Sequence, residues 1–262
     1  MNTQDWQACP LDMSDLDLSG DKLREQWDRL HAGNREPFPP SAQLQEAWRQ
    51  YHLGNFAQAV NIGLEMDGQG LVPAAFATTI YAQYIEKNDK NKTELFKEAM
   101  AMCKKAEMSG VSSANVHYMY AVAMGRYSQF ISMIEALAQG FGGSIKEQLE
   151  KCLGLEPDHA EAYVTYGGWH AGITDQAGAL MARMLYGATQ CGAHEHYDAA
   201  VKLAPGAVVP FIEYARGLEV MYGSDDPGVV EKLQRALQLT AHDAMQRLDQ
   251  EQARQQLAQL QA

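Results

Sequence analysis

Apolar residues recur at intervals of three and four along most of this chain. Ile145, Leu149, Cys152 and Leu153 form one such stripe, and Ala, Leu, Gln, Glu and Met dominate the stretches between glycines and prolines. This spacing places apolar side chains on one face of an α-helix, whereas the strict alternation typical of strands is nearly absent. The pattern predicts an all-α protein.

Three short motifs predict where individual helices begin. Ser144 and Asp158 each lie three residues before a glutamate, which is the spacing of a capping box. Asp226 precedes Pro227, and this order suits an N-cap followed by proline at the first helical position. We therefore expect new helices to begin at these three places.

The same pattern of large and small residues returns along the chain. The segment "LEKCLGLEPDHAEAYVTYGGWHAG" (149–172) can be laid over "YDAAVKLAPGAVVPFIEYARGLEV" (197–220), so that Tyr166-Gly167 meets Tyr214-Ala215. An aromatic residue followed by alanine also occurs at Tyr120 and at Tyr81. Repetition at this spacing predicts an array of helix pairs joined by longer connections.

Two flanking segments complete the predicted organisation. Residues 14–33 have an acidic amphipathic pattern with Leu16, Leu23, Trp27 and Leu30 on one face, and the linker "REPFPPS" follows. From Pro227 onward one face stays apolar while Gln, Arg and Asp cover the rest, as a terminal repeat requires. We predict an N-terminal segment (1–40) with one helix, a repeat domain (41–222) and a C-terminal capping helix (223–262).

Two stretches resemble a known helical repeat. "GNFAQAV" (54–60) resembles the turn and second-helix opening of a tetratricopeptide repeat, and "LGLEPDHAEAYVTYG" (153–167) resembles its closing proline and next first helix. The resemblance implies a tetratricopeptide-like array, an irregular right-handed α superhelix. The period here is longer than the 34 residues of such repeats, so insertions such as 173–192 are expected to add helical segments.

A second resemblance is to the regulator-of-microtubule-dynamics branch of these proteins and its bacterial relatives. The blocks "GRYSQFISMIEALAQG", "IKEQLEKCLGLEPDHAEAYVTYGGWH" and "ARMLYGA" carry it. This resemblance implies a scaffold or a binding module that is not an enzyme. A protein or peptide segment is therefore the expected partner.

The resemblance also implies which residues contact that partner. The inner faces of first helices are the expected surface, and the positions that fall there are Thr79, Gln83, Glu86, Tyr118, Val122, Val164, Gly168, Ile212 and Arg216. The set lacks the lysines and asparagines with which some tetratricopeptide proteins hold a terminal carboxylate. Gly167 falls where paired helices approach most closely, which predicts a structural role, while Gly168 and Trp169 have no counterpart in the other repeats.

Charge and composition narrow the classes of partner. The chain has 33 acidic and 21 basic residues, a formal charge of -12, which disfavours nucleic acid and anionic membranes. The opening residues lack a basic segment followed by an apolar one, and no long apolar run occurs, so we expect neither a secretory signal nor a membrane span. A cytoplasmic location is therefore expected. Four scattered cysteines without a CxxC pair predict reduced thiols.

The segment "CGAHEHYD" (191–198) has the most enzyme-like composition. On a helix, His194 and Asp198 share a face but His196 points away from both, so we expect neither a metal nor any other cofactor. His170 could join these residues only through a tertiary contact. Two alternatives to a protein-binding module remain open: a carrier that encloses a small apolar ligand near Tyr118, Val164 and Trp169, and, less favoured, a metal-dependent enzyme.

Overall fold

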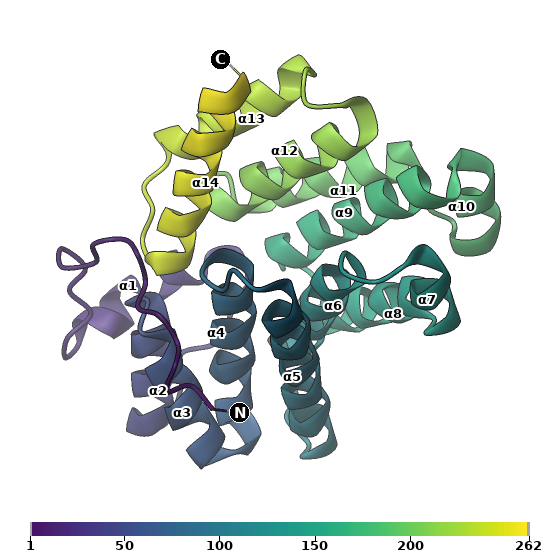
Figure 1. Ribbon diagram of the computed structural model, residues 1–262. Coiled ribbons are helices and arrows are strands. Elements are labelled where there is room, and N and C mark those ends of the chain that lie inside the picture. The colour runs from purple at the N-terminus through teal and green to yellow at the C-terminus, as the bar shows by residue number, and fades with distance from the viewer. Residues whose placement is uncertain (1, 261–262) are drawn as a thin grey trace. The chain divides into compact units, whose positions relative to one another are not determined.

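The computed structural model describes residues 2–260, and every regular element in this range is helical (Figure 1). The prediction of an all-α protein is confirmed. The helices are α1 (Lys22–Leu30), α2 (Ala42–His52), α3 (Phe56–Met66), α4 (Leu71–Tyr84), α5 (Asp89–Met108), α6 (Ala114–Ser128), α7 (Met133–Ala138), α8 (Phe141–Leu155), α9 (Ala160–Ala177), α10 (Ala179–Tyr186), α11 (Gln190–Leu203), α12 (Val208–Tyr222), α13 (Pro227–Gln238) and α14 (Ala244–Leu260), with a 3-10 turn at Gly68–Gly70.

The chain folds into two compact units, each assembled from segments that are distant in the sequence. Unit 1 consists of the residues up to His31, Glu36–Ser132 and the short segment His242–Met245. Unit 2 consists of Ala32–Arg35, Met133–Ala241 and the chain from Gln246 onward. The first residues of α14 therefore belong to unit 1 and the rest of that helix to unit 2.

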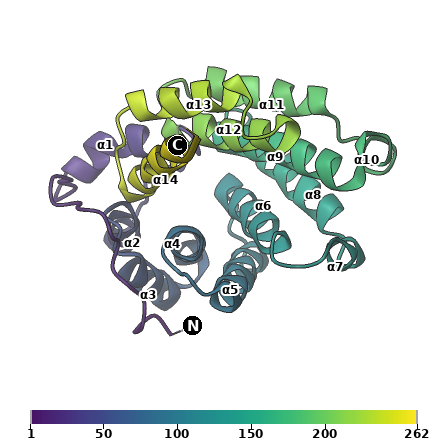
Figure 2. The same ribbon diagram turned by 45° about the horizontal axis from the view of Figure 1, so that its top comes forward.

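Unit 1 is a row of helices in which each packs against the next, from α2 to α6 (Figure 2). Helix α4 is central because it packs against α2, α3, α5 and α6, and its residues from Leu71 to Ala82 are all buried. Large aromatic side chains fill the core, with Trp48, Phe76 and Phe96 among the most deeply buried. Helix α1 joins this core through Trp27, whose ring meets Trp48 edge to face.

Unit 2 is organised around α9, which packs against α8, α10, α11 and α12, while α12 also packs against α13. One apolar cluster joins α9, α11, α12, α13 and α14, with Tyr197 and Leu233 among its most deeply buried members. These successive packed pairs confirm the predicted helix-pair array.

Local capping explains where several helices begin. Helix α13 begins at Pro227, and the Asp226 side chain accepts a hydrogen bond from the Gly228 amide at 2.8 Å, so this predicted start is confirmed. Helix α9 begins one residue later than a cap at Asp158 would set it. His159 is its N-cap, and Nδ1 of this imidazole accepts from the Ala162 amide at 2.9 Å.

The predicted start at Ser144 is wrong. Helix α8 begins at Phe141, directly after Gly140, which has a φ of 68°. This left-handed conformation is accessible to glycine without strain, and Gly140 separates α7 from α8. Ser144 consequently lies within the first turns of α8.

The flanking and inserted segments follow the predicted pattern in part. Helix α1 is shorter than the predicted 14–33: Leu23, Trp27 and Leu30 are buried on one face of the helix, whereas Leu16 precedes it. The insertion 173–192 contains α10, as predicted. Two helices, α13 and α14, follow Gly223. Along the described chain, no helix combines the length and apolarity needed to cross a membrane.

Candidate functional site

Gly167 is a point of close helix packing in unit 2. A Cβ atom added to Gly167 would lie 2.7 Å from two carbons of the Tyr197 ring, much closer than a normal contact. Gly217 of α12 meets the same tyrosine from another side, since its Cβ would lie 1.8 Å from the hydroxyl oxygen. The Tyr197 ring is thus held between two glycine-bearing helices, and the predicted structural role of Gly167 is confirmed.

The nine predicted contact positions differ widely in exposure. Thr79, Tyr118, Val164 and Ile212 are buried, and the Tyr118 ring packs 6.0 Å from that of Phe76. The remaining five are at least partly exposed: Gln83, Glu86 and Val122 in unit 1, and Gly168 and Arg216 in unit 2. A partner can therefore touch only these five directly in the described conformation.

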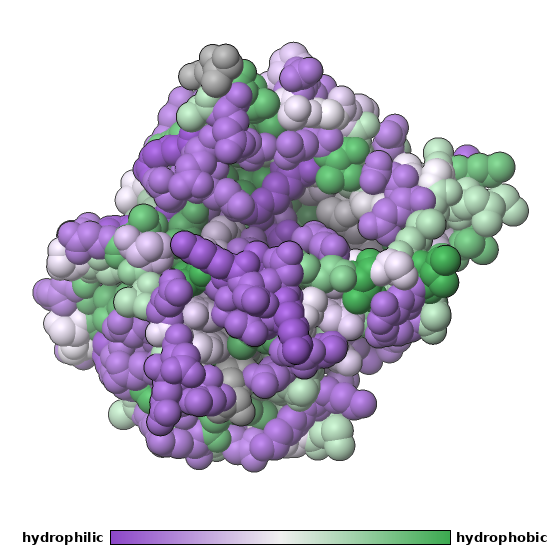
Figure 3. All heavy atoms as spheres, in the orientation of Figure 1, coloured by the Kyte–Doolittle hydropathy of each residue, from purple (hydrophilic) through white to green (hydrophobic). Residues whose placement is uncertain are grey.

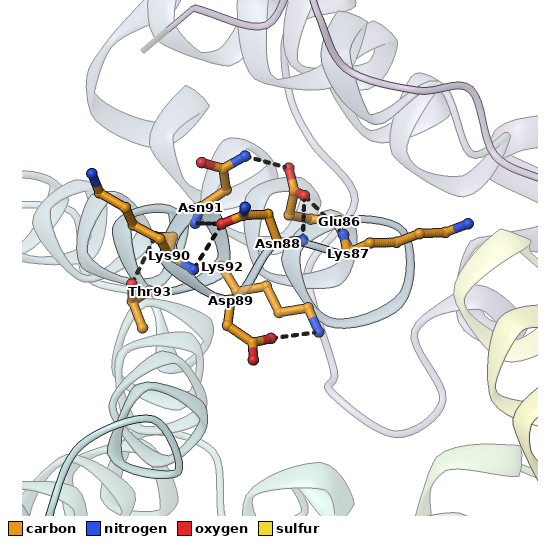
Figure 4. Close-up of polar contacts among 8 residues, drawn as sticks. All are labelled: Glu86, Lys87, Asn88, Asp89, Lys90, Asn91, Lys92 and Thr93. Carbon is orange, nitrogen blue, oxygen red and sulfur yellow. Dashed lines mark hydrogen bonds and ion pairs between the residues drawn. The ribbon is translucent and has the colours of Figure 1, made fainter.

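Glu86 has a clear local task in the connection between α4 and α5 (Figure 4). Its carboxylate accepts hydrogen bonds from the Lys87 and Asn88 amides, both at 2.8 Å, and from the Asn91 side chain at 3.3 Å. Asn88 in turn caps α5 by accepting from the Lys90 and Asn91 amides. These bonds fix the turn, and the Lys87 and Lys90 side chains extend away from it.

Arg216 also makes intramolecular contacts. Its guanidinium pairs with Glu213 on the same helix and reaches α14, where it contacts Gln252 and lies 3.9 Å from an Asp249 oxygen. The arginine therefore ties α12 to the C-terminal helix within unit 2. Among the nine positions in the described chain, only Gly168 is exposed rather than buried or partly buried.

The residues of the "CGAHEHYD" segment lie on α11 and turn to different partners. His194 contacts the Tyr214 and Tyr222 hydroxyls at 3.0 and 2.8 Å, and the Tyr214 hydroxyl also donates to Asp198, which confirms that His194 and Asp198 share a face. His196 points elsewhere, as predicted, and its Nδ1 lies 2.7 Å from the Gly192 carbonyl.

Packing of α9 against α11 brings together a cluster that the sequence did not reveal. The His170 ring stacks on Tyr166 and lies 5.0 Å from the His196 ring, and Trp169 packs edge-on to it at 4.9 Å. Burial, together with the nearby His196 and Lys146, lowers the pKa of His170 to about 4, and Glu195 opposes this lowering. His170 is therefore neutral at physiological pH.

The hydrogen bonds of this cluster do not suit a metal ion. His170 Nδ1 accepts from the Thr189 amide at 3.1 Å, so in the neutral ring the proton lies on Nε2, the nitrogen that a metal would need. No group of three or more His, Cys, Asp or Glu side chains within the described residues is arranged to hold a metal. The cluster is better described as aromatic packing around a neutral imidazole.

Unit 2 also exposes large apolar side chains on two short helices. Ile134 is 78% exposed, Met184 72% and Leu180 71%. In Figure 3, hydrophobic residues gather at the right-hand edge, where α7 and α10 lie in Figure 1. We call this set the α7/α10 patch, and its members are Met133, Ile134, Leu137, Leu180, Met181, Met184 and Leu185.

Residues 44–261 match the model of one protein family, described as regulator of microtubule dynamics protein 1-3. The chain belongs to this family. The match covers most of both units and confirms the resemblance inferred from the sequence blocks. No individual curated protein is similar to the chain at a significant level.

Solved structures include a helical repeat protein of comparable extent. The crystal structure of YrrB, described as a TPR protein with an unusual peptide-binding site, is similar over 84% of this chain and 91% of YrrB. The TM-score is 0.41 and the sequence identity 15%. Its peptide-binding site is a property of YrrB.

Proposed function

We propose that this chain is a non-catalytic interaction module that binds a peptide or protein segment. The observation that carries the proposal is the α7/α10 patch. Large exposed apolar side chains that gather on one part of a protein surface often mark an interaction site. The helix-pair fold and the family membership support the same function.

The form of the patch favours a helical partner segment. On α10, Leu180 and Met184 are four residues apart, as are Met181 and Leu185, so the side chains form two neighbouring ridges along the helix. Methionine is flexible and polarisable, and it adapts to apolar surfaces of different shape. An amphipathic helix with apolar residues at similar spacing is therefore the partner that we expect.

The predicted first-helix face is a second contact surface within this proposal. Gln83 and Val122 are partly exposed and Gly168 is exposed, and none of the three has a structural role like those described for Glu86 and Arg216. Thr79, Tyr118, Val164 and Ile212 are buried and contribute by shaping the helices. We propose that these positions contact a partner within their own units, Gln83 and Val122 in unit 1 and Gly168 in unit 2.

A double variant of the patch tests the proposed function. Leu180→Ser combined with Met184→Ser removes two of the most exposed apolar side chains of α10, whereas Leu155→Ser with Val220→Ser removes exposed apolar side chains from α8 and α12. A partner segment captured by cross-linking in cells would be purified and titrated calorimetrically against both. We expect binding to the patch variant to weaken at least tenfold, about 1.4 kcal/mol, and binding to the control to be unchanged.

The proposal fails if the segment binds the patch variant with wild-type affinity. It also fails if cross-linking enriches no polypeptide beyond the amount recovered with an unrelated control protein. Circular dichroism melts of both double variants should match the wild type, because the substituted side chains are exposed and contribute little to the core.

A further inference from the structure

Four of the methionines that the structure describes have exposed side chains, and three of these four belong to the α7/α10 patch. Met133 of α7 is 49% exposed, and Met181 and Met184 of α10 are 48% and 72% exposed. The fourth is Met108, at the end of α5 in unit 1, which is 79% exposed. Accessible thioether sulfur is therefore concentrated on the surface that we propose as the docking site.

Helix α10 places a methionine on each line of its exposed apolar surface. The helix packs against α9 and buries Ala182, while Met181 and Met184 stay on the solvent side. Each of its two ridges, Leu180 with Met184 and Met181 with Leu185, contains one leucine and one methionine. A partner helix that covers either ridge must therefore place its apolar side chains against a thioether.

A thioether reacts with hydrogen peroxide without any change in the polypeptide backbone. A lone pair on sulfur attacks one peroxide oxygen, the O–O bond breaks, and the other oxygen leaves as water. Sulfur loses two electrons and the peroxide gains them, so methionine becomes methionine sulfoxide. Methionine sulfoxide reductases reverse the change with two electrons from a pair of thiols, which become a disulfide, and the sulfoxide oxygen leaves as water.

Oxidation replaces an apolar contact by a polar one at the same position. The sulfoxide oxygen is a hydrogen-bond acceptor and is solvated while the patch is free. Docking of an apolar partner face removes this water, and the desolvation opposes binding. The sulfoxide thus weakens docking without removing any side chain from the patch.

The core of the protein is shielded from the same reaction. Met102, Met119 and Met124 are buried in unit 1, each at 6% exposure or less. The patch methionines are exposed and contribute little to the stability of the fold. Mild oxidation therefore changes the docking surface and leaves the folded structure in place.

We propose that Met133, Met181 and Met184 make the α7/α10 patch an oxidation-controlled docking site. Oxidation of these thioethers by hydrogen peroxide releases the docked segment, and enzymatic reduction of the sulfoxides restores binding. This inference rests on the proposed function of the patch and adds its regulation.

The test compares the full chain before and after treatment with hydrogen peroxide, in a Cys191→Ser background that removes an exposed thiol. Peptide mass mapping would identify the sulfoxides, which we expect at the four exposed methionines and not at the three buried ones. The fluorescence of 8-anilinonaphthalene-1-sulfonate, a dye that binds exposed apolar surface, would report on the patch. We expect the patch signal, defined as the part lost in Leu180→Ser with Met184→Ser, to fall at least about threefold on oxidation. Methionine sulfoxide reductases with dithiothreitol should restore it.

Two leucine variants identify the responsible sulfur atoms. The triple variant Met133→Leu, Met181→Leu, Met184→Leu keeps apolar side chains of similar volume without a thioether, so its dye signal should match the wild type and resist peroxide. Met108→Leu is the matched control, because it removes a methionine at least as exposed but outside the patch. A peroxide response in the triple variant, or a lost response in Met108→Leu, would contradict the proposal.

Failure of the redox control and failure of the docking site give different results. If the dye signal is lower in Leu180→Ser with Met184→Ser but unchanged by oxidation, the redox control is wrong and the docking site stands. If wild type and that double variant give the same signal, the patch offers no binding surface and both proposals fail. In the cross-linking experiment, the oxidised chain should recover at least tenfold less of the captured segment, and equal recovery would overturn the redox control.

Discussion

Two adjacent glycines in α9 have opposite surroundings. A Cβ on Gly167 would lie 2.7 Å from the Tyr197 ring, whereas the nearest atom to a Cβ on Gly168 would be 3.8 Å away. We therefore expect Gly167→Ala to lower the free energy of unfolding by about 1–3 kcal/mol through overpacking. Gly168→Ala should raise it by up to about 1 kcal/mol, because alanine is the better helix former.

Chemical denaturation of the two single variants measures this difference. Each serves as the other's control, since both replace glycine by alanine within the same turn of the same helix. Equal effects of the two substitutions would show that the Tyr197 ring does not lie against Gly167. A large stabilisation by Gly167→Ala would likewise show that position 167 is not in close contact with the Tyr197 ring.

At the level of single residues, the sequence indicated contacts made within a repeat and missed those made across the fold. Gly167 was identifiable because an aligned segment has alanine at the same place. The His170–His196 pair was not, because it depends on how α9 and α11 rotate against each other. His52 and Asp243 are 191 positions apart, and no local pattern in either segment indicates that they meet.

The helix starts show the same distinction for whole elements. Asp226 with Pro227 predicted α13 correctly because an N-cap acts on amides two or three residues away. At α9 the cap is His159, an uncommon choice that moves the start by one residue. At α8 the backbone of Gly140 sets the start, and a capping spacing further on has no effect.

The turn between α4 and α5 yields a prediction about a residue that was expected to contact a partner. Glu86→Ala removes the acceptor for two backbone amides and for Asn91, so we expect a loss of about 1 kcal/mol in stability. Lys87→Ala is the matched control because its side chain extends away from the turn. Identical melting temperatures for the two variants would show that the Glu86 carboxylate is not needed for stability, which would leave it available for binding.

For the molecule as a whole, buried ionisable groups determine how stability changes with pH. Burial lowers the pKa of His159 to about 3 and that of His170 to about 4. Below pH 6.5 the unfolded chain therefore binds more protons at these two sites than the folded chain does, and their contribution to the free energy of unfolding rises with pH. Burial raises the pKa of Glu36 to about 7, against a lowering bond from Asn115. The contribution of Glu36 to the free energy of unfolding therefore falls as the pH rises from about 4.5 to about 7. We expect maximal stability near pH 6.5.

Glu36→Gln isolates the carboxyl part of this profile. The amide can accept the Asn115 bond and carries no charge, so we expect a melting temperature several degrees higher than wild type at pH 8. At pH 4 the difference should nearly vanish, because the carboxyl is then mostly neutral in both states. An equal shift at both pH values would point to altered packing instead.

The tyrosine held between α9 and α12 has a consequence for how this family diverges. A side chain at position 167 or 217 would crowd the Tyr197 ring. We therefore expect a lineage that acquires a larger residue at either position to reduce the ring at 197 as well. These three positions should change together among descendants, and their joint substitution would serve as an evolutionary marker for the correct alignment of α9, α11 and α12.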